Sequence, residues 1–264
     1  MRKGITMTEL LEQIKELVRQ AGALLLEAAP EELEISSKEG HGNFVTDYDV
    51  RVQALLFSRL KELLPGAAFV GEEGDGPISV GKGYTFIIDP IDGTTNFICG
   101  YRFSAISIGL ALNGEAVLGV VYNPWSGELY WAQRGKGAYL NGKRLQLRNR
   151  PLSEGVVCCG TAPYNLELTD QTFDMMKTLF LHSMDIRRQG SAALDLCYLA
   201  AGRNVLFFEW KLSPWDFAAA SVIIREAGGV LTAMDGGEAS LNRKGSVLAG
   251  TSRAVEEFHA LTGI

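Results

Sequence analysis

The chain has 264 residues, of which 47% are hydrophobic and 21% are charged. These proportions are typical of a globular protein with a sizeable buried core. The formal net charge of −6 argues against a protein that binds nucleic acid or an anionic membrane by electrostatic attraction.

Three further patterns narrow the class of protein. No run of eighteen apolar residues occurs, so we expect no membrane span and no membrane partner. The three histidines are scattered, and the four cysteines contain no C-x-x-C pair, which argues against a zinc site or a disulfide framework. The charges near the N-terminus have no apolar segment behind them, so we expect no signal peptide and a cytoplasmic protein.

The first part of the chain predicts two helices followed by strands. Residues 8–28 and 49–64 carry apolar side chains at helical spacing, with Thr8 as the expected first cap and Pro65-Gly66 as the stop of the second helix. From residue 68 onward the period changes to two. The strands expected there are 68–70, 85–88, 105–112, 115–122, 128–133 and 138–140. Asn113-Gly114 predicts a hairpin turn.

The second part of the chain mixes both element types in separate blocks. We expect strands at 156–159 and 205–208, helices at 169–182, 191–201 and 214–227, and a last strand that begins at Val230. Pro214 favours the first helical turn, and Gly228-Gly229 ends that helix. Because helices and strands are grouped in blocks, the sequence predicts a layered α+β chain.

The stretch FIIDPIDGTTNF, residues 86–97, places two carboxylates at the end of an apolar strand. Asp89 precedes a proline and should stay extended, after which the chain must turn. The Gly-Thr-Thr that follows Asp92 is typical of a helix N-terminus, whose free N–H groups attract phosphate. Carboxylates for a cation and amides for an anion together indicate a metal–phosphate site, and Mg²⁺ prefers oxygen ligands of this kind.

Each of these patterns also has an ordinary structural interpretation. Taken alone, Asp-Pro-x-Asp-Gly slightly favours a turn whose aspartates cap a helix. Glu72 in Gly-Glu-Glu is equally compatible with a solvated acidic turn, and Asp216 with a charge that complements a helix dipole. Thr46 or Asp47 could simply cap the second helix. The occurrence of all four segments in this order is more specific than any one of them.

Together these motifs resemble the inositol monophosphatase family of Mg²⁺-dependent, lithium-sensitive phosphatases. FIIDPIDGTTNF matches the family's first signature, and SPWDFAAA with REAGGVL matches the second. GEE, FVTDYD, RGKGAYLNGKRL and FFEWKLSPWD follow the family order, and the resemblance runs from about residue 8 to the end. It implies an α+β fold, a five-layer α-β-α-β-α sandwich of the inositol monophosphatase/fructose-1,6-bisphosphatase type. Residues 1–264 would form one unit, with a metal-site half of about 8–150 and a second half of about 151–264.

The resemblance also implies metal ligands. Glu72, Asp89 and the carbonyl of Ile91 would bind a first Mg²⁺, and Asp89, Asp92 and Asp216 would bind a second. A third, looser ion would lie near Glu72, which gives two or three Mg²⁺ ions in each active site. Clustered carboxylates repel one another unless cations lie between them, which explains physically why such a site should bind divalent ions.

The catalytic residues implied by the resemblance are Thr94, Asp49 and Glu72. The hydroxyl of Thr94 would orient the attacking water, and Asp49 would hydrogen-bond to Thr94. The backbone of Gly93, Thr94 and Thr95 would hold phosphate oxygens. Catalysis would then depend on positioning and charge neutralisation, without a phospho-enzyme.

For the substrate, the resemblance implies myo-inositol monophosphate or a similar small polyol phosphate. Glu209 matches a glutamate that binds substrate hydroxyls in animal members, although an acid at a sheet edge is the plain alternative. Ala192 and Thr161 match positions that line the same pocket, and Lys38 matches a lysine near the metal site. The resemblance further implies a homodimer, and we expect no nucleic-acid partner.

Other substrates and another class of function stay open at this point. Fructose 1,6-bisphosphate, 3′-phosphoadenosine 5′-phosphate, NADP and histidinol phosphate are substrates of related enzymes. Lys211 or the pair Arg187-Arg188 could bind a second substrate phosphate. A non-catalytic metal- or phosphate-binding regulatory protein is the alternative of another class, but no expected metal ligand is missing.

Overall fold

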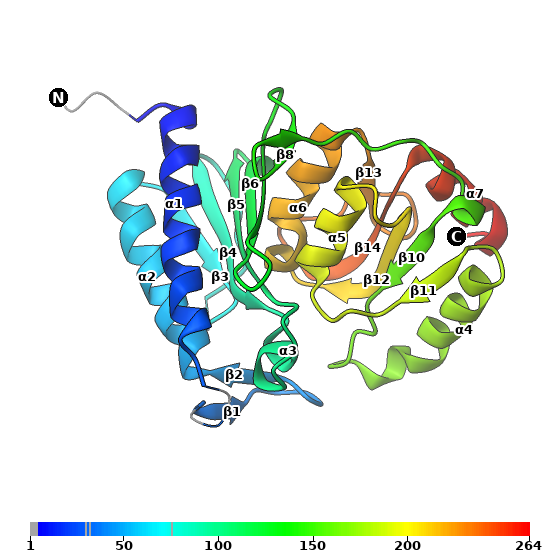
Figure 1. Cartoon of the computed structure of the whole chain (residues 1–264), viewed down its shortest axis with the longest axis horizontal. Coiled ribbons are helices and arrows are strands. Elements are labelled where there is room, and N and C mark those ends of the chain that lie inside the picture. The colour runs from blue at the N-terminus through cyan, green and yellow to red at the C-terminus, as the bar shows by residue number, and fades with distance from the viewer. Residues whose placement is uncertain (1–4, 30, 32, 75) are drawn as a thin grey trace.

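The computed structural model describes residues 5–29, 31, 33–74 and 76–264. Two sheets alternate with three layers of helices, so the chain forms a five-layer α-β-α-β-α sandwich (Figure 1). Each pair of facing layers encloses apolar side chains, and three hydrophobic clusters fill the sandwich. The α+β fold expected from the sequence is confirmed.

The first layer consists of α1 (Met7–Leu26) and α2 (Asp47–Leu63), which pack on one face of the first sheet (Figure 1). The expectation that Thr8 caps α1 is wrong. Thr6 is the cap, because its side chain accepts a hydrogen bond from the N–H of Glu9 while Glu9 accepts one from Thr6 in return. Helix α2 begins with the same reciprocal arrangement between Thr46 and Asp49, which confirms Thr46 as its cap.

The first sheet has seven strands in the order β3-β4-β5-β6-β7-β8-β9. Their bounds are β3 (Ala68–Gly71), β4 (Tyr84–Asp92), β5 (Ala105–Leu112), β6 (Glu115–Asn123), β7 (Glu128–Gln133), β8 (Ala138–Leu140) and β9 (Lys143–Arg144). Within this sheet, β3 and β4 pair in parallel and the other neighbouring strands pair antiparallel. Strand β4 continues to Asp92, beyond the expected end at residue 88. Its register shifts between Asp89 and Asp92, since Pro90 has no N–H for the ladder.

The central layer contains α5 (Ala192–Ala200) and α6 (Pro214–Ala227), which lie between the two sheets (Figure 1). Helix α6 runs from Pro214 to Ala227 and is capped by Gly228, as the sequence predicts. The hydroxyl of Ser107 on β5 donates to the carbonyl of Trp215, 3.3 Å away, and fixes the start of α6 against the first sheet.

The second sheet has five strands in the order β11-β10-β12-β14-β13. Their bounds are β10 (Val156–Cys159), β11 (Asp185–Arg187), β12 (Leu206–Leu212), β13 (Val230–Thr232) and β14 (Gly245–Gly250). Helices α4 (Thr169–Phe180) and α7 (Ser252–Thr262) form the outer layer. The expectation that the last strand begins at Val230 is wrong, because β14 and α7 follow it. Strand β14 pairs with both β12 and β13, so it is central to this sheet.

Three short elements lie near one end of the first sheet. They are β1 (Ile35–Ser37), β2 (Phe44–Thr46) and α3 (Thr94–Ile98), and β1 pairs with β2 (Figure 1). The four cysteines are free thiols. None of the helices in the described part of the chain is both long and apolar enough to cross a membrane.

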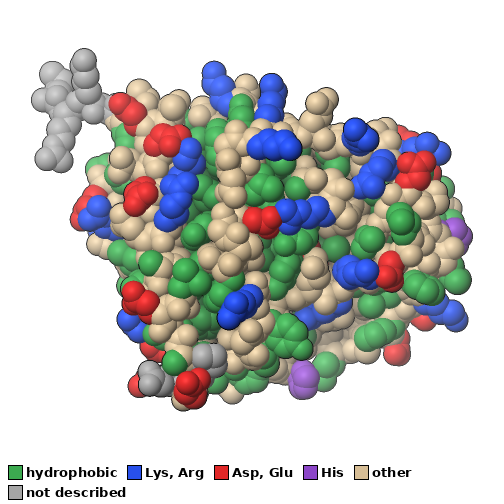
Figure 2. All heavy atoms as spheres, in the orientation of Figure 1, with side chains coloured by type: hydrophobic (Ala, Val, Ile, Leu, Met, Phe, Trp, Pro, Cys, Tyr) green, Lys and Arg blue, Asp and Glu red, His purple; other side chains and the backbone are tan. Residues whose placement is uncertain are grey.

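The visible surface carries charges of both signs. On the face in Figure 2, Lys and Arg side chains alternate with Asp and Glu side chains and do not gather in one large basic region.

Candidate active site

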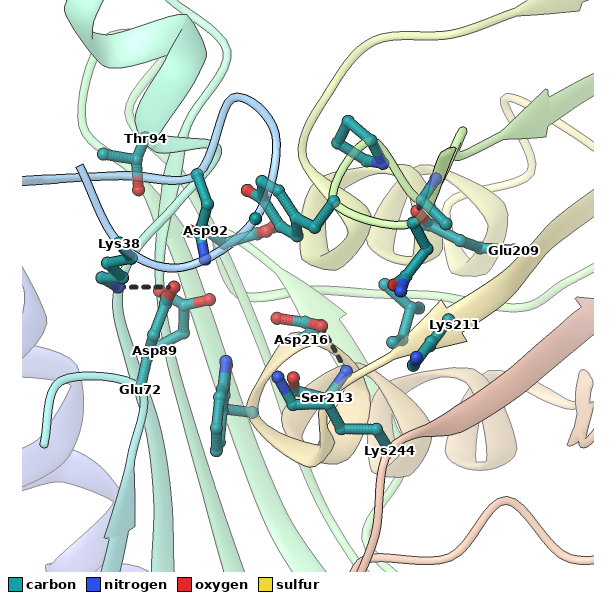
Figure 3. Close-up of a pocket in the computed structure, with 18 of the residues that line it drawn as sticks. Lys38, Glu72, Asp89, Asp92, Thr94, Glu209, Lys211, Ser213, Asp216 and Lys244 are labelled. Atoms are coloured by element: carbon teal, nitrogen blue, oxygen red, sulfur yellow. Dashed lines mark hydrogen bonds and ion pairs between the residues drawn. The ribbon is translucent and has the colours of Figure 1, made fainter. Parts of the chain in front are cut away.

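Carboxylates from three segments meet in one place: at the end of β4, at the start of α6 and directly after β3. Oxygens of Asp89, Asp92 and Asp216 all lie within 4.8 Å of one another, and we call these three residues the acid cluster. Glu72, directly after β3, lines the same cleft of about 570 Å³, the main cleft. Figure 3 shows Glu72 beside Asp89 on one side, with Asp216 facing them from the start of α6.

The local structure explains why two aspartates occupy the end of β4. Asp89 still pairs with Ser107 of β5 in the ladder, and its Oδ1 accepts a hydrogen bond from the N–H of Ile91 at 3.0 Å. The side chain of Ile91 is fully buried in the core under α1 and α2. The buried side chain of Ile91 and the register shift at Pro90 therefore hold Asp89 and Asp92 at the cleft.

Asp216 has a second structural role at the start of α6. Its Oδ2 accepts the N–H of Ser213 at 2.6 Å as part of a capping box. Asp92 is held from the other side, since its Oδ2 accepts the hydroxyl of Ser191 and the N–H of Ala193 at the start of α5. Two helix N-termini of the central layer thus point at the acid cluster.

The charges in the acid cluster oppose one another. Burial, and then the charges of Glu72, Asp92 and Asp216, raise the pKa of Asp89 well above its ordinary value. Loss of water, followed by the charges of Asp92 and Glu72, raises the pKa of Asp216 in the same way. Burial raises the pKa of Asp92 to about 6, although Ser191 and Ala193 lower it. A bound cation would relieve this repulsion, and an all-oxygen donor set fits a hard divalent ion.

Beside the acid cluster, Thr94 and Asp49 form a buried hydrogen-bonded pair. The hydroxyl of Thr94 lies 3.3 Å from Asp49 Oδ1 and 3.1 Å from the carbonyl oxygen of Ile91, either of which can accept its hydrogen. Asp49 Oδ2 accepts both the N–H and the hydroxyl of Thr46. Burial raises the pKa of Asp49 to about 7 despite these hydrogen bonds.

The expected phosphate-binding turn is the start of α3. Gly93 is the cap residue and has a left-handed φ of 93°, which favours glycine. The first N–H groups of a helix have no partner within the helix. Gly93 and Thr94 line the main cleft next to the carboxylates.

A second cavity of about 290 Å³, the side pocket, adjoins the main cleft and shares Asp92, Thr94 and Glu209 with it. Glu209 is only 6% exposed. Its Oε1 accepts the N–H of Ala162 at 2.9 Å, and burial raises its pKa to about 7. Figure 3 shows Glu209 on the opposite side of the cleft from Asp89.

Comparison with known proteins identifies the family. The sequence profile described as the inositol monophosphatase family matches residues 6–262. The chain belongs to the inositol monophosphatase family.

Two relatives carry different names. The chain is 40% identical over 219 residues to an inositol-1-monophosphatase from Mesorhizobium japonicum, which covers 83% of this chain and 82% of that protein. It is 37% identical over 245 residues to the Nus factor SuhB of Escherichia coli K12, and this match covers 92% of this chain and 91% of that protein. A crystal structure of the extragenic suppressor protein suhB from Bartonella henselae superposes with a TM-score of 0.89 at 34% identity, covering 97% of this chain and 99% of that one. The family supports a phosphatase activity, whereas the names of the relatives do not fix a substrate.

The structure brings together most of the residues that the family resemblance singles out. Ala192 and Thr95 line the side pocket with Glu209. Thr161 is not among the described residues that line either cavity, and its neighbour Ala162 lines the main cleft instead. Glu209 does not lie at a sheet edge, because β12 pairs with β10 and β14.

Lys38 lies closer to the acids than the sequence alone indicates. Its Nζ lies 3.1 Å from Glu72 Oε1 and 2.6 Å from Glu73 Oε1 (Figure 3 marks the first contact). Asp195 and Ser191 also line the side pocket and were not singled out from the sequence. Arg188, one of the two arginines considered for a second substrate phosphate, lines it too. The signal in the sequence that could have pointed to Asp195 is its position as an isolated acid in the otherwise apolar helix α5.

Proposed function

We propose that the protein is a Mg²⁺-dependent phosphomonoesterase whose substrate is myo-inositol monophosphate or a similar small polyol phosphate. The observation that carries this proposal is the meeting of three carboxylates within 4.8 Å beside a helix N-terminus in one cleft. A group of carboxylates and a helix N-terminus in the same cleft suit a phosphate group that also contacts metal ions.

Asp89, Asp92 and Asp216 would hold one Mg²⁺, and Glu72, Asp89 and the carbonyl of Ile91 a second, with a third near Glu72. When bound, such ions neutralise the carboxylates, hold phosphate oxygens and lower the pKa of a water ligand. The carbonyl of Ile91 lies 3.1 Å from the hydroxyl of Thr94, so Thr94 and this ligand belong to one hydrogen-bonded unit.

Thr94 and Asp49 would position the attacking water. Because the hydroxyl hydrogen of Thr94 points to Asp49 or to the carbonyl of Ile91, its oxygen is left to accept a hydrogen bond from water. Asp49 is fixed in turn by two hydrogen bonds from Thr46. The water oxygen forms a bond to phosphorus and gives up one proton, the ester P–O bond breaks, and the alcohol oxygen takes up one proton, so that one water is consumed for each ester.

The N–H groups of Gly93, Thr94 and Thr95 would bind phosphate oxygens at the start of α3, where the helix dipole favours a negative charge. The organic part of the substrate would extend toward Glu209 and Ala192 on the far side of the cleft. A carboxylate with a free oxygen suits the hydroxyl groups of a polyol.

A panel of substrates tests the proposal by phosphate release with Mg²⁺ and with EDTA. Inositol 1-phosphate, glycerol 2-phosphate, fructose 1,6-bisphosphate, 3′-phosphoadenosine 5′-phosphate, NADP and histidinol phosphate form this panel. We expect inositol 1-phosphate to be hydrolysed fastest and EDTA to stop the reaction. A faster bisphosphate would keep the metal site but overturn the polyol assignment, and no hydrolysis with any divalent ion would overturn the enzyme assignment.

The relatives named Nus factor SuhB favour a second candidate, a role as a Nus factor, for which hydrolysis is not required. The two candidate functions can be distinguished by measuring both the phosphatase activity and the Nus-factor role of the Asp89→Asn variant. If the Asp89→Asn variant loses phosphatase activity but retains the cellular role of the wild type, the acid cluster serves hydrolysis only. Loss of both would tie the cellular role to the acid cluster.

A further inference from the structure

The side pocket contains a buried carboxyl group that the proposed reaction does not use. Asp195, in the first turn of α5, is 1% exposed and lines this pocket. Its Oδ1 accepts a hydrogen bond from Gln189 Nε2 at 2.6 Å. Among the described residues, no donor contacts its Oδ2. A buried carboxyl oxygen without a donor needs a ligand or water to satisfy it, and the side pocket that Asp195 lines has room for either.

Glu209 presents a second carboxyl oxygen to the same pocket. Its Oε1 is bound by the N–H of Ala162, whereas no donor among the described residues contacts Oε2. A Cβ added to Gly160 would lie 1.9 Å from Oε2, so the absence of a side chain at this position leaves room for the carboxyl group. Glu209 is therefore fixed on the β10 side of the pocket, and Asp195 approaches from α5.

Arg188 supplies the positive charge that faces these two acids. It lines the side pocket. Burial raises the pKa of both Asp195 and Glu209, and the positive charge of Arg188 partly opposes this rise. Two carboxyl groups against one guanidinium repel a second phosphate and do not attract a cation strongly. A hydroxyl group suits this environment, because it donates to a carboxylate and can also accept from a protonated carboxyl group or from Arg188.

We propose that the carboxyl group of Asp195 binds one hydroxyl group of the substrate, beside the hydroxyl that Glu209 binds, and so selects polyol phosphates over phosphates without hydroxyls. This inference rests on the proposed function, which supplies the phosphate end of the substrate. It adds a second specificity residue on another structural element, so the two carboxyl groups recognise two positions of the carbon skeleton.

The test compares kcat/KM for inositol 1-phosphate with kcat/KM for 4-nitrophenyl phosphate, which has no alcohol hydroxyls. The variant is Asp195→Asn, which keeps the side-chain shape and an oxygen for Gln189. The matched control is Asp185→Asn, since Asp185 pairs with Arg187 on β11 and lines neither cavity.

In Asp195→Asn we expect the ratio of the two kcat/KM values to fall about tenfold, mainly through a higher KM for inositol 1-phosphate. Asp185→Asn should leave the ratio unchanged. A purely structural role of Asp195 would lower both kcat/KM values and Tm together, and an unchanged ratio overturns the inference alone. A wild-type protein that hydrolyses neither substrate overturns the proposed function and the inference with it.

The first part of a second measurement uses the wild-type protein and does not depend on the variant folding. A series of deoxyinositol 1-phosphates, each lacking one hydroxyl, is hydrolysed by the wild-type protein. We expect about tenfold losses of kcat/KM at no fewer than two ring positions, and one of these losses should disappear in Asp195→Asn. Loss at a single position overturns the inference, because Glu209 would then account for the selectivity by itself.

Discussion

The acid cluster and the side pocket both bury carboxyl groups, but the surroundings of these groups differ. In the acid cluster, Asp89, Asp92 and Asp216 face one another within 4.8 Å. In the side pocket, each acid has one hydrogen-bond donor, and Arg188 supplies an opposing charge. The first arrangement contains no opposing positive charge of its own, whereas the second contains one and leaves two carboxyl oxygens without donors.

This contrast shows how one cleft can separate two tasks. Under the proposed function, mutual repulsion would make the acid cluster bind cations, and the unpaired carboxyl oxygens would make the side pocket select hydroxyl groups by hydrogen-bond geometry. Helices α5 and α6 connect the two regions, because the start of α5 holds Asp92 and carries Asp195, while α6 carries Asp216. The following changes test the contrast, from the largest expected effect to the smallest.

Asp89→Asn should have the largest effect on catalysis. Because Asp89 is assigned to both metal positions, we expect kcat to fall by about 10³-fold or more with saturating Mg²⁺. The same change removes a charge from a repulsive cluster, so stability without metal should rise by about 1 kcal/mol. Phosphate release and calorimetric unfolding measure the two effects. Near-normal turnover would contradict the assignment of Asp89 as a metal ligand.

Thr94→Ala should come next. It removes the hydroxyl that lies between Asp49 and the carbonyl of Ile91, and we expect kcat to fall about 100-fold while Mg²⁺ binding persists. Thr95→Ala is the matched control, because only the backbone of Thr95 is assigned a role. Equal losses in the two variants would speak against a water-positioning hydroxyl at residue 94.

Mg²⁺ should stabilise the folded protein through the acid cluster. A ligand at 100 times its Kd adds about 2.7 kcal/mol to the free energy of unfolding. We expect Tm to rise with Mg²⁺ concentration in the wild type and much less in Asp216→Asn. Glu238→Gln serves as a control, since Glu238 lies outside the main cleft. A Tm that is independent of Mg²⁺ would count against a cation site here.

Gly160→Ala should affect the side pocket alone. The new Cβ would lie 1.9 Å from Glu209 Oε2, so the carboxyl group must move. We expect about a tenfold loss of kcat/KM for inositol 1-phosphate, with a much smaller loss for 4-nitrophenyl phosphate. Equal losses for both substrates would show that the side pocket and the acid cluster are not separable.

The pH dependence of stability gives the smallest effect. The pKa values of Asp49 and Glu209 are raised to about 7, and that of Asp92 to about 6. The folded protein therefore binds protons more tightly than the unfolded chain, and this stabilisation is lost as pH rises toward about 7. Without metal, we expect the free energy of unfolding to fall by about 1–2 kcal/mol from about pH 6.5 to about pH 8. Constant or rising stability would be inconsistent with these raised pKa values.

Much of the fold and of the acid cluster can be predicted from the sequence because the signals are local. The stretch FIIDPIDGTTNF contains the strand, the turn and the helix start that place Asp89, Asp92 and Thr94. Strand β14 is not predicted from the sequence, because GSVLAG has glycine at both ends and no alternation of polar and apolar residues. It is a strand because β12 and β13 pair with it on either side.

Long-range contacts explain what else the sequence does not reveal. Asp195 resembles an ordinary acid in the first turn of a helix, and only the packing of α5 against β12 places it in the side pocket. Lys38 contacts Glu72 across 34 positions of the chain. For the substrate end of the cleft, residue type alone is therefore a weaker guide than for the metal end.

The most direct measurement is a Mg²⁺ titration of metal-stripped protein, followed by phosphate release from inositol 1-phosphate. Wild-type activity should rise from near zero and saturate, and Asp89→Asn should stay near zero over the same range. If the metal-stripped wild type hydrolyses the substrate as fast as the Mg²⁺-loaded protein, or if the two proteins respond alike, the acid cluster is not the centre of a metal-dependent phosphatase.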